Sequence, residues 1–114
     1  MALVSVPDLI HRGEVYLVAL SPTRGREIRK TRPCVVVSPD ELNAHLETFI
    51  IVPLTTGSHP YPFRLACRFA GKNGSLVLDQ LRVVDRDRLV RRLGRLSSES
   101  LAGALAVLRE MFAP

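Results

Sequence analysis

The chain has 114 residues, of which 46% are apolar and 24% charged, and its formal net charge is +5. This length predicts one domain over residues 1–114, and the apolar content excludes a disordered chain. No apolar run reaches bilayer length and no charged signal-peptide start is present, so we expect a soluble, cytoplasmic protein. Fourteen of the sixteen basic residues are arginine, which favours a nucleic acid or an acidic protein as partner.

The first expected strand, residues 14–20, is apolar at nearly every position, which is typical of a strand packed on both sides. Residues 24–30, called the basic loop below, follow with four basic side chains and one acid. Next comes the β-branched run Cys34–Val37, which predicts a buried strand. Pro33 fits only the start or edge of that strand, and it holds Arg32 in an extended conformation at the beginning of the strand.

Residues 39–46 predict a short helical turn with Asp40 as its N-cap. The apolar residues 48–54 predict a further strand, in which Pro53 indicates an edge or a bulge. A looser alternation over residues 61–69 predicts a strand with one apolar face and one face bearing two arginines. The apolar face comprises Phe63, Leu65, Cys67 and Phe69, and the other carries Arg64 and Arg68.

Residues 71–74 end in Asn-Gly and predict a hairpin turn. A strand is expected over residues 75–84, a helical turn over 85–89, a last strand over 91–96 and a terminal helix capped by Ser97. A small all-β chain must close or curl its sheet to protect the edges. We therefore expect a mainly β fold, a small barrel with appended helices.

Most enzyme motifs are absent from the sequence, including nucleotide-binding glycine loops and the HExxH metal motif. Cys34 and Cys67 lack any metal-ligand spacing, so we interpret both as reduced core residues, with a disulfide as the minor alternative, and expect no metal site. Arg32 begins one strand, Thr55 ends a neighbouring one and Gln80 closes a third, so all three are expected on one rim below the basic loop. An arginine and a hydroxyl suit RNA cleavage, because RNA supplies its own 2′-OH nucleophile and no cofactor is needed.

At these residues the chain resembles the MazF/PemK (Kid) family of toxin endoribonucleases. The resemblance extends from about residue 6 to the start of the terminal helix. The matching stretches are Arg12-Gly13-Glu14-Val15-Tyr16, Ser21-Pro22-Thr23-Arg24-Gly25-Arg26-Glu27, Arg32-Pro33, Val52-Pro53-Leu54-Thr55-Thr56, Tyr61-Pro62-Phe63 and Asp79-Gln80-Leu81-Arg82. Each stretch is short, but their order and spacing together are specific.

The resemblance implies a homodimer of SH3-like barrels of the CcdB/MazF type and metal-independent, sequence-specific cleavage of single-stranded RNA. The products would carry 2′,3′-cyclic phosphate and 5′-hydroxyl ends, and an antitoxin with an acidic, apolar tail would block the groove. It assigns catalysis to Arg32, as acid or base and charge stabiliser, and to Thr55, which would position the phosphate or the 2′-OH. The residues that match RNA contacts are Gly25, Arg26, Glu27, Arg29, Lys30, Thr56, Ser58, His59, Tyr61 and Gln80.

The chain departs from many relatives in the basic loop, where Gly25-Arg26-Glu27-Ile28 replaces Gly-Ser-Glu-Gln. Since this loop helps to select bases, the cut sequence does not carry over. Two alternatives are a non-catalytic toxin that poisons DNA gyrase and a plain binding module for nucleic acid or protein. Gyrase-poisoning relatives lack the Arg-Pro and threonine pair, so Arg32 and Thr55 favour the ribonuclease.

Overall fold

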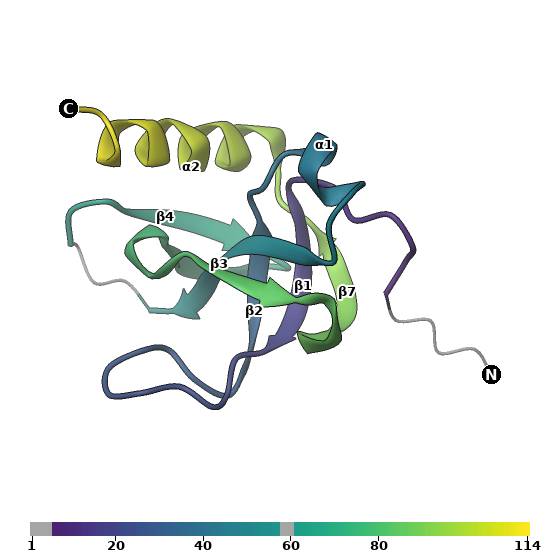
Figure 1. Cartoon of the computed structure of the whole chain (residues 1–114). Coiled ribbons are helices and arrows are strands. Elements are labelled where there is room, and N and C mark those ends of the chain that lie inside the picture. Colours follow the sequence, from purple (N-terminus) through teal and green to yellow (C-terminus); the bar gives the residue numbers. More distant parts are fainter. Residues whose placement is uncertain (1–5, 58–60) are drawn as a thin grey trace.

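The computed structural model describes residues 6–57 and 61–114, which contain seven strands and two α-helices (Figure 1). The strands are β1 (Glu14–Ala19), β2 (Thr31–Val36), β3 (Thr48–Thr56), β4 (Arg64–Phe69), β5 (Lys72–Val77), β6 (Arg82–Asp85) and β7 (Leu89–Arg95). The helices are α1 (Asp40–Asn43) and α2 (Ser98–Met111), with the 3-10 turns η1 (Leu78–Gln80) and η2 (Arg86–Arg88). Helix α2 lies above β4, and the basic loop projects at the opposite, lower side (Figure 1).

All strand pairs are antiparallel, in the order β4-β5-β3-β2-β1-β7, and β6 pairs with the first half of β3. In a flat sheet β6 and β7 would lie four strand spacings apart, or about 19 Å. The chain between them passes through η2, and its four residue steps from Asp85 to Leu89 advance only about 8 Å. The sheet must therefore curl until β6 and β7 come close, which confirms the expected barrel.

Two clusters of buried side chains cover the two faces of the sheet. The first fills the barrel and includes Tyr16, Val18, Cys34 and Phe49. The second lies under α2 and includes Val15 from the other face of β1. Residues of β1 thus contribute to both clusters, as its unbroken apolar run predicts.

Both cysteines are free thiols, as expected from the sequence. Cys34 is buried in the first cluster, whereas Cys67 is only half-buried beside the second. Burial raises the pKa of the Cys34 thiol to about 12 and also raises that of Cys67. Both thiols are therefore protonated at neutral pH. None of the described helices is long and apolar enough to cross a membrane.

Arginines from β6 and η2 fix the end of β1, from which the basic loop departs. Arg82 Nη1 donates to the carbonyl oxygen of Leu20 at 3.3 Å. Arg88 Nη1 donates to the carbonyls of Ala19 and Ser21 at 3.0 and 2.7 Å. The base of the loop is closed by two further bonds, from Leu20 N to the Lys30 carbonyl and from Lys30 N to Ser21 Oγ, both 2.9 Å.

The predicted hairpin turn at Asn73-Gly74 is wrong. Phe69 pairs with Lys72, so the two-residue turn is Ala70-Gly71, both with positive φ (52° and 78°). Such φ values match the primed turns that suit the twist of a hairpin. Gly74 lies inside β5 instead, where a Cβ atom would overlap the carbonyl oxygen of Thr55. Its role is close backbone approach, not turn formation.

The single strand expected over residues 75–84 is also wrong, because η1 interrupts it between β5 and β6. This break lets β5 pair with the end of β3 and β6 with its beginning. Pro53 lies where the partner changes, since β6 pairs only as far as Ile51 and β5 begins at Leu54. Proline therefore sits in a central strand, not at the expected edge, because its missing N–H falls in the gap between two ladders.

Three smaller predictions concern caps and a strand start. Asp40 is the first residue of α1 and not its N-cap, which is Pro39; the Asp40 carboxylate accepts the Arg12 N–H at 2.8 Å. Phe63 was expected on the apolar face of a strand, but it precedes β4, is exposed and has φ 61°. Ser97 caps α2 as predicted, with its hydroxyl accepting the Ser100 N–H.

Candidate functional site

A polar hollow of about 540 Å³ lies between the basic loop and the ends of β2, β3 and β4. It contains all three residues expected on one rim, namely Arg32, Thr55 and Gln80. The described residues that line it are Arg26, Glu27, Ile28, Arg29, Arg32, Thr55, Thr56, Arg64, Val77 and Gln80. Four arginines against one acid make it a strongly cationic surface, suited to a ligand that carries phosphates.

The antiparallel register explains why Arg32 meets Thr55. The β2–β3 ladder ends with the pair Cys34–Pro53, and Arg32 and Thr55 each lie two residues beyond that pair, so a continuation of the same register places them opposite each other. Residues opposite each other in antiparallel strands project from the same face. Thr56 follows on the strand, so its side chain projects from the other face, and it is more exposed. The geometry therefore favours Thr55 over Thr56 as the partner of Arg32.

The Arg32 guanidinium is oriented by the basic loop. Its Nε donates to the carbonyl oxygen of Arg29 at 3.2 Å. This bond uses only one of its three nitrogens, and within the described residues Nη1 and Nη2 have no hydrogen-bond partner. These two nitrogens form the edge of the guanidinium that binds phosphate oxygens side by side. The position of the loop thus determines the orientation of Arg32.

Several residues of the loop bind one another. The Glu27 carboxylate accepts the Arg24 N–H at 2.8 Å, and Glu27 N donates to the Arg24 carbonyl at 3.1 Å. Arg29 Nη2 donates to the carbonyl of Gly25, whose φ of 58° suits glycine. Glu27 and Gly25, both expected RNA contacts, therefore also shape the loop. Arg26 and Arg29 line the hollow, whereas Lys30 lies outside it at the loop's base.

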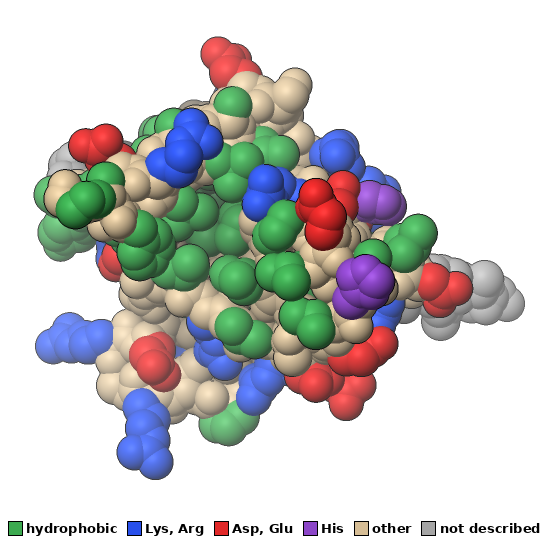
Figure 2. All heavy atoms as spheres, turned by 45° about the horizontal axis from the view of Figure 1, so that its top comes forward, with side chains coloured by type: hydrophobic (Ala, Val, Ile, Leu, Met, Phe, Trp, Pro, Cys, Tyr) green, Lys and Arg blue, Asp and Glu red, His purple; other side chains and the backbone are tan. Residues whose placement is uncertain are grey.

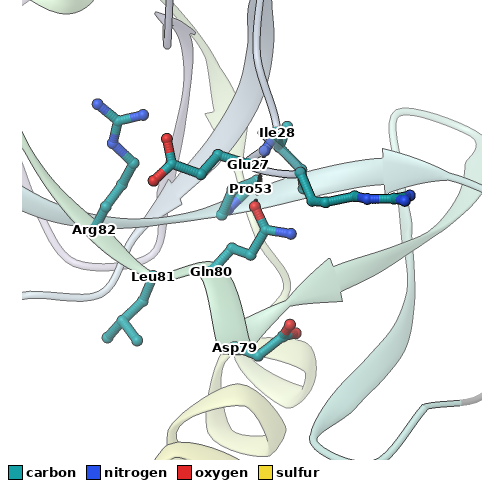
Figure 3. Close-up of a pocket in the computed structure, with 8 residues that line it drawn as sticks. Glu27, Ile28, Pro53, Asp79, Gln80, Leu81 and Arg82 are labelled. Atoms are coloured by element: carbon teal, nitrogen blue, oxygen red, sulfur yellow. Dashed lines mark hydrogen bonds between the residues drawn. The ribbon is translucent and has the colours of Figure 1, made fainter. Parts of the chain in front are cut away.

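Gln80 ties the loop to η1. Its side-chain Oε1 accepts the N–H of Ile28 at 2.8 Å, across a separation of 52 residues. Figure 3 shows Gln80 directed up towards Ile28, with Asp79 below it. Gln80 and Asp79 both line a second hollow, of about 410 Å³. The Ile28 side chain packs against the first buried cluster. The loop is thus held at one residue by both a hydrogen bond and apolar contact.

Arg64 is a site residue that the sequence pattern does not reveal, because the pattern places Arg64 on the polar face of its strand and indicates no partner for it. The structure places it in the hollow, with Nε and Nη2 bound to the two oxygens of Asp79 at 2.9 and 3.0 Å. These hydrogen bonds hold the pKa of Asp79 below its usual value. Tyr61, an expected RNA contact, does not line the hollow but lies against Arg64, 4.8 Å from ring centre to guanidinium carbon.

Ser58 and His59, two further expected RNA contacts, lie outside the described residues. A third hollow, of about 290 Å³, shares Arg32, Thr55 and Thr56 with the polar one. Its other lining is largely apolar, with Pro33, Leu54, Phe69 and Leu93. Over residues 6–57 and 61–114, no group of three His, Cys, Asp or Glu side chains is placed to hold a metal ion.

The fold and this site define a small antiparallel barrel with a cation-rich hollow suited to a phosphate-bearing ligand. Residues 11–112 match the model of one family, the PemK-like, MazF-like toxins of type II toxin–antitoxin systems, and the chain belongs to this family. The endoribonuclease MazF9 of Mycobacterium tuberculosis is 35% identical over 105 residues, which covers 82% of this chain and 88% of the relative.

Two solved structures have the same fold. The crystal structure of MazF (Form-I) from Deinococcus radiodurans has a TM-score of 0.81 at 24% identity, covering 92% of this chain and 97% of that one. An endoribonuclease in complex with its cognate antitoxin, from a mycobacterial species, has a TM-score of 0.77 at 22% identity, with the same coverage of both chains.

Proposed function

We propose that this protein is the toxin of a type II toxin–antitoxin system and a sequence-specific endoribonuclease that cleaves single-stranded RNA in the cytoplasm and so inhibits translation and growth. The observation that carries the proposal is the meeting of Arg32 and Thr55 on one face of the sheet, inside the cationic hollow. Family membership and the relative named as an endoribonuclease support it.

The reaction uses the RNA, these side chains and solvent water, which carries the proton that Arg32 does not transfer. The 2′-oxygen attacks the neighbouring phosphorus and loses its proton, while the bond to the 5′-oxygen breaks and that oxygen gains a proton. The products are a 2′,3′-cyclic phosphate and a 5′-hydroxyl. Arg32 stabilises the negative charge that builds on the phosphate oxygens and acts as acid or base, and the Thr55 hydroxyl positions the phosphate or the 2′-OH.

The variants Arg32→Ala and Thr55→Ala test these roles. Each is expected to abolish cleavage while the protein stays folded, because each removes a group that contacts the reacting phosphate. Arg68→Ala and Thr48→Ala are the matched controls, since both side chains are exposed and lie outside the hollow. Near-normal cleavage by either site variant would show that the site is misassigned.

A substrate with 2′-deoxyribose at the cut position tests the nucleophile. It is expected to bind as the all-ribose RNA does and to resist cleavage, because the attacking hydroxyl is missing. Cleavage of this substrate would exclude the 2′-OH as nucleophile.

We assign the antitoxin tail to the same region, since a cationic hollow and an apolar one meet at Arg32 and Thr55. A tail that alternates acidic and apolar residues complements both. A synthetic peptide of that pattern is expected to displace labelled RNA, whereas one with lysine in place of the acids is not. Equal displacement by both peptides, or by neither, would contradict the assignment.

A homodimer is supported by the apolar face beside α2 (Figure 2), where a hollow of about 480 Å³ is lined by Val37, Ile50, Leu81, Leu105, Leu108 and Phe112. Phe112 is 69% exposed, and such patches commonly mark interfaces. Sedimentation equilibrium is expected to show a dimer that Phe112→Asp dissociates. Val90→Asp, at an exposed valine of β7 that does not line this hollow, is the control. A wild-type monomer would refute this part of the proposal.

A further inference from the structure

Arg64 lines the cationic hollow from β4, whereas Arg32 lines it from β2. It begins β4, opposite Val77 of β5, and three strand spacings, about 14 Å, separate the backbones of β4 and β2. Both arginines nevertheless line the same hollow. Since they reach into it from two strands, they can contact different phosphates of one RNA strand.

The Arg64 guanidinium is held in a fixed orientation. Two of its nitrogens, Nε and Nη2, donate to both oxygens of Asp79, which fixes the plane of the group. The guanidinium carbon also lies over the Tyr61 ring, 4.8 Å from its centre. Among the described residues Nη1 has no hydrogen-bond partner, and the side chain is 22% exposed. One end of the guanidinium is thus anchored while the other stays available to a ligand.

Asp79 orients Arg64 and is poorly suited to proton transfer. The hydrogen bonds from Arg64 lower its pKa, so it is ionised and a poor base at neutral pH. Exposed ion pairs of this kind also add little to stability. Orientation of Arg64 is the effect that remains.

We propose that Arg64 is a phosphate-binding residue of the groove, positioned by Asp79 and Tyr61, which holds the RNA phosphate next to the one at Arg32 and Thr55. The inference rests on the proposed ribonuclease function and extends it to a residue outside the Arg32–Thr55 pair. Arg64 contributes to RNA binding and not to bond cleavage, because it contacts a phosphate that does not react.

The test uses the full-length protein and a fluorescein-labelled RNA. This RNA contains the cut sequence, first mapped by digestion of a long unstructured RNA, with 2′-deoxyribose at the cut position. Its Kd is measured by anisotropy over a salt series for wild type, Arg64→Ala, Arg64→Lys and the control Arg68→Ala. Arg68 lies on the same face of β4, is exposed and does not line the hollow. Single-turnover cleavage of the all-ribose RNA and thermal unfolding are measured for the same four proteins.

Arg64→Ala is expected to bind about tenfold more weakly. Its slope of log K against log salt is expected to fall by about 0.7, the value for one phosphate contact on a single strand. Its cleavage rate at saturating RNA is expected to stay within twofold of wild type. Arg64→Lys is expected to keep the thermal stability of wild type through a Lys–Asp79 pair. It is expected to bind RNA as weakly as Arg64→Ala does, because a lysine ammonium that is paired with Asp79 has no counterpart of the free Nη1 end of the guanidinium.

Three binding results would overturn the inference. These are an unchanged Kd and salt slope in Arg64→Ala, wild-type binding by Arg64→Lys, and equal weakening by Arg64→Ala and Arg68→Ala. Loss of cleavage with intact binding would also overturn it, since Arg64 would then act in the chemical step. Absence of cleavage by the folded wild type would instead refute the proposed function, so the two failures are distinguishable.

Discussion

Replacing Gln80 by leucine removes the hydrogen bond that joins η1 to the basic loop. Gln80 Oε1 accepts the Ile28 N–H at 2.8 Å, and leucine has a similar size but no acceptor. The loop in turn supplies the Arg29 carbonyl, which accepts the hydrogen bond from Arg32 Nε. Gln80→Leu is therefore expected to change the orientation of the Arg32 guanidinium, although Gln80 does not contact Arg32 directly in this chain of hydrogen bonds.

The magnitude follows from the environment of this bond. A hydrogen bond of this kind contributes about 1 kcal/mol net, and water can reach the N–H of Ile28 when the exposed loop moves. The apolar contacts of the Ile28 side chain remain, so the fold is retained. A change of about 1 kcal/mol shifts the loop's opening equilibrium about fivefold, and kcat/KM is expected to fall by a similar factor.

Hydrogen exchange of the Ile28 amide and steady-state cleavage together provide the assay. Gln80→Leu is expected to lose protection at Ile28 and activity in parallel. Gln80→Glu is the matched control, because its carboxylate still accepts the N–H while its charge repels phosphate; protection is kept and KM rises. Unchanged protection and activity in Gln80→Leu would refute the reasoning.

Three further predictions concern residues beyond the loop. Gly74→Ala is expected to destabilise the protein by about 1–3 kcal/mol and to lower cleavage, since its Cβ overlaps the Thr55 carbonyl; urea unfolding measures this, and an unchanged midpoint would contradict it. Iodoacetamide at pH 8 is expected to leave Cys34 unmodified in the native protein, because burial raises its pKa to about 12; mass spectrometry showing modification before unfolding would contradict it. Arg64 lowers the pKa of Asp79, so their ion pair stabilises the fold by up to about 1 kcal/mol above pH 3.8, and this stabilisation is lost as the pH falls through the lowered pKa. Thermal melts of Asp79→Asn are expected to lack that part of the dependence of stability on acid pH. Identical acid profiles for Asp79→Asn and wild type would argue against the prediction.

The parts of the fold that depend on local pattern were predictable from the sequence. The apolar runs of β1 and β2 indicated buried strands, and the Arg-Pro pair placed Arg32 at a strand start. The meeting of Arg32 with Thr55 followed from antiparallel pairing alone. These features are specified by neighbours in sequence or by the simplest pairing of neighbouring strands.

The parts that depend on distant contacts were not predictable. Asn73-Gly74 has the strongest local turn signal, but Ala70-Gly71 forms the turn because Gly74 is required against the backbone of β3. The η1 break follows from two strands sharing one edge of β3. Arg64 was missed because its partner Asp79 is fifteen residues away, within that same break.

The central claim is that Arg32 and Thr55 make this protein a ribonuclease that uses the 2′-OH of its substrate. The most direct measurement is an end-mapped digest of a long unstructured RNA, with chelator present and Arg32→Ala alongside. Cuts at one short sequence, with 2′,3′-cyclic phosphate and 5′-hydroxyl ends that disappear in the variant, are the expected result. Cuts that persist in Arg32→Ala, or no cuts by the folded wild type, would contradict it.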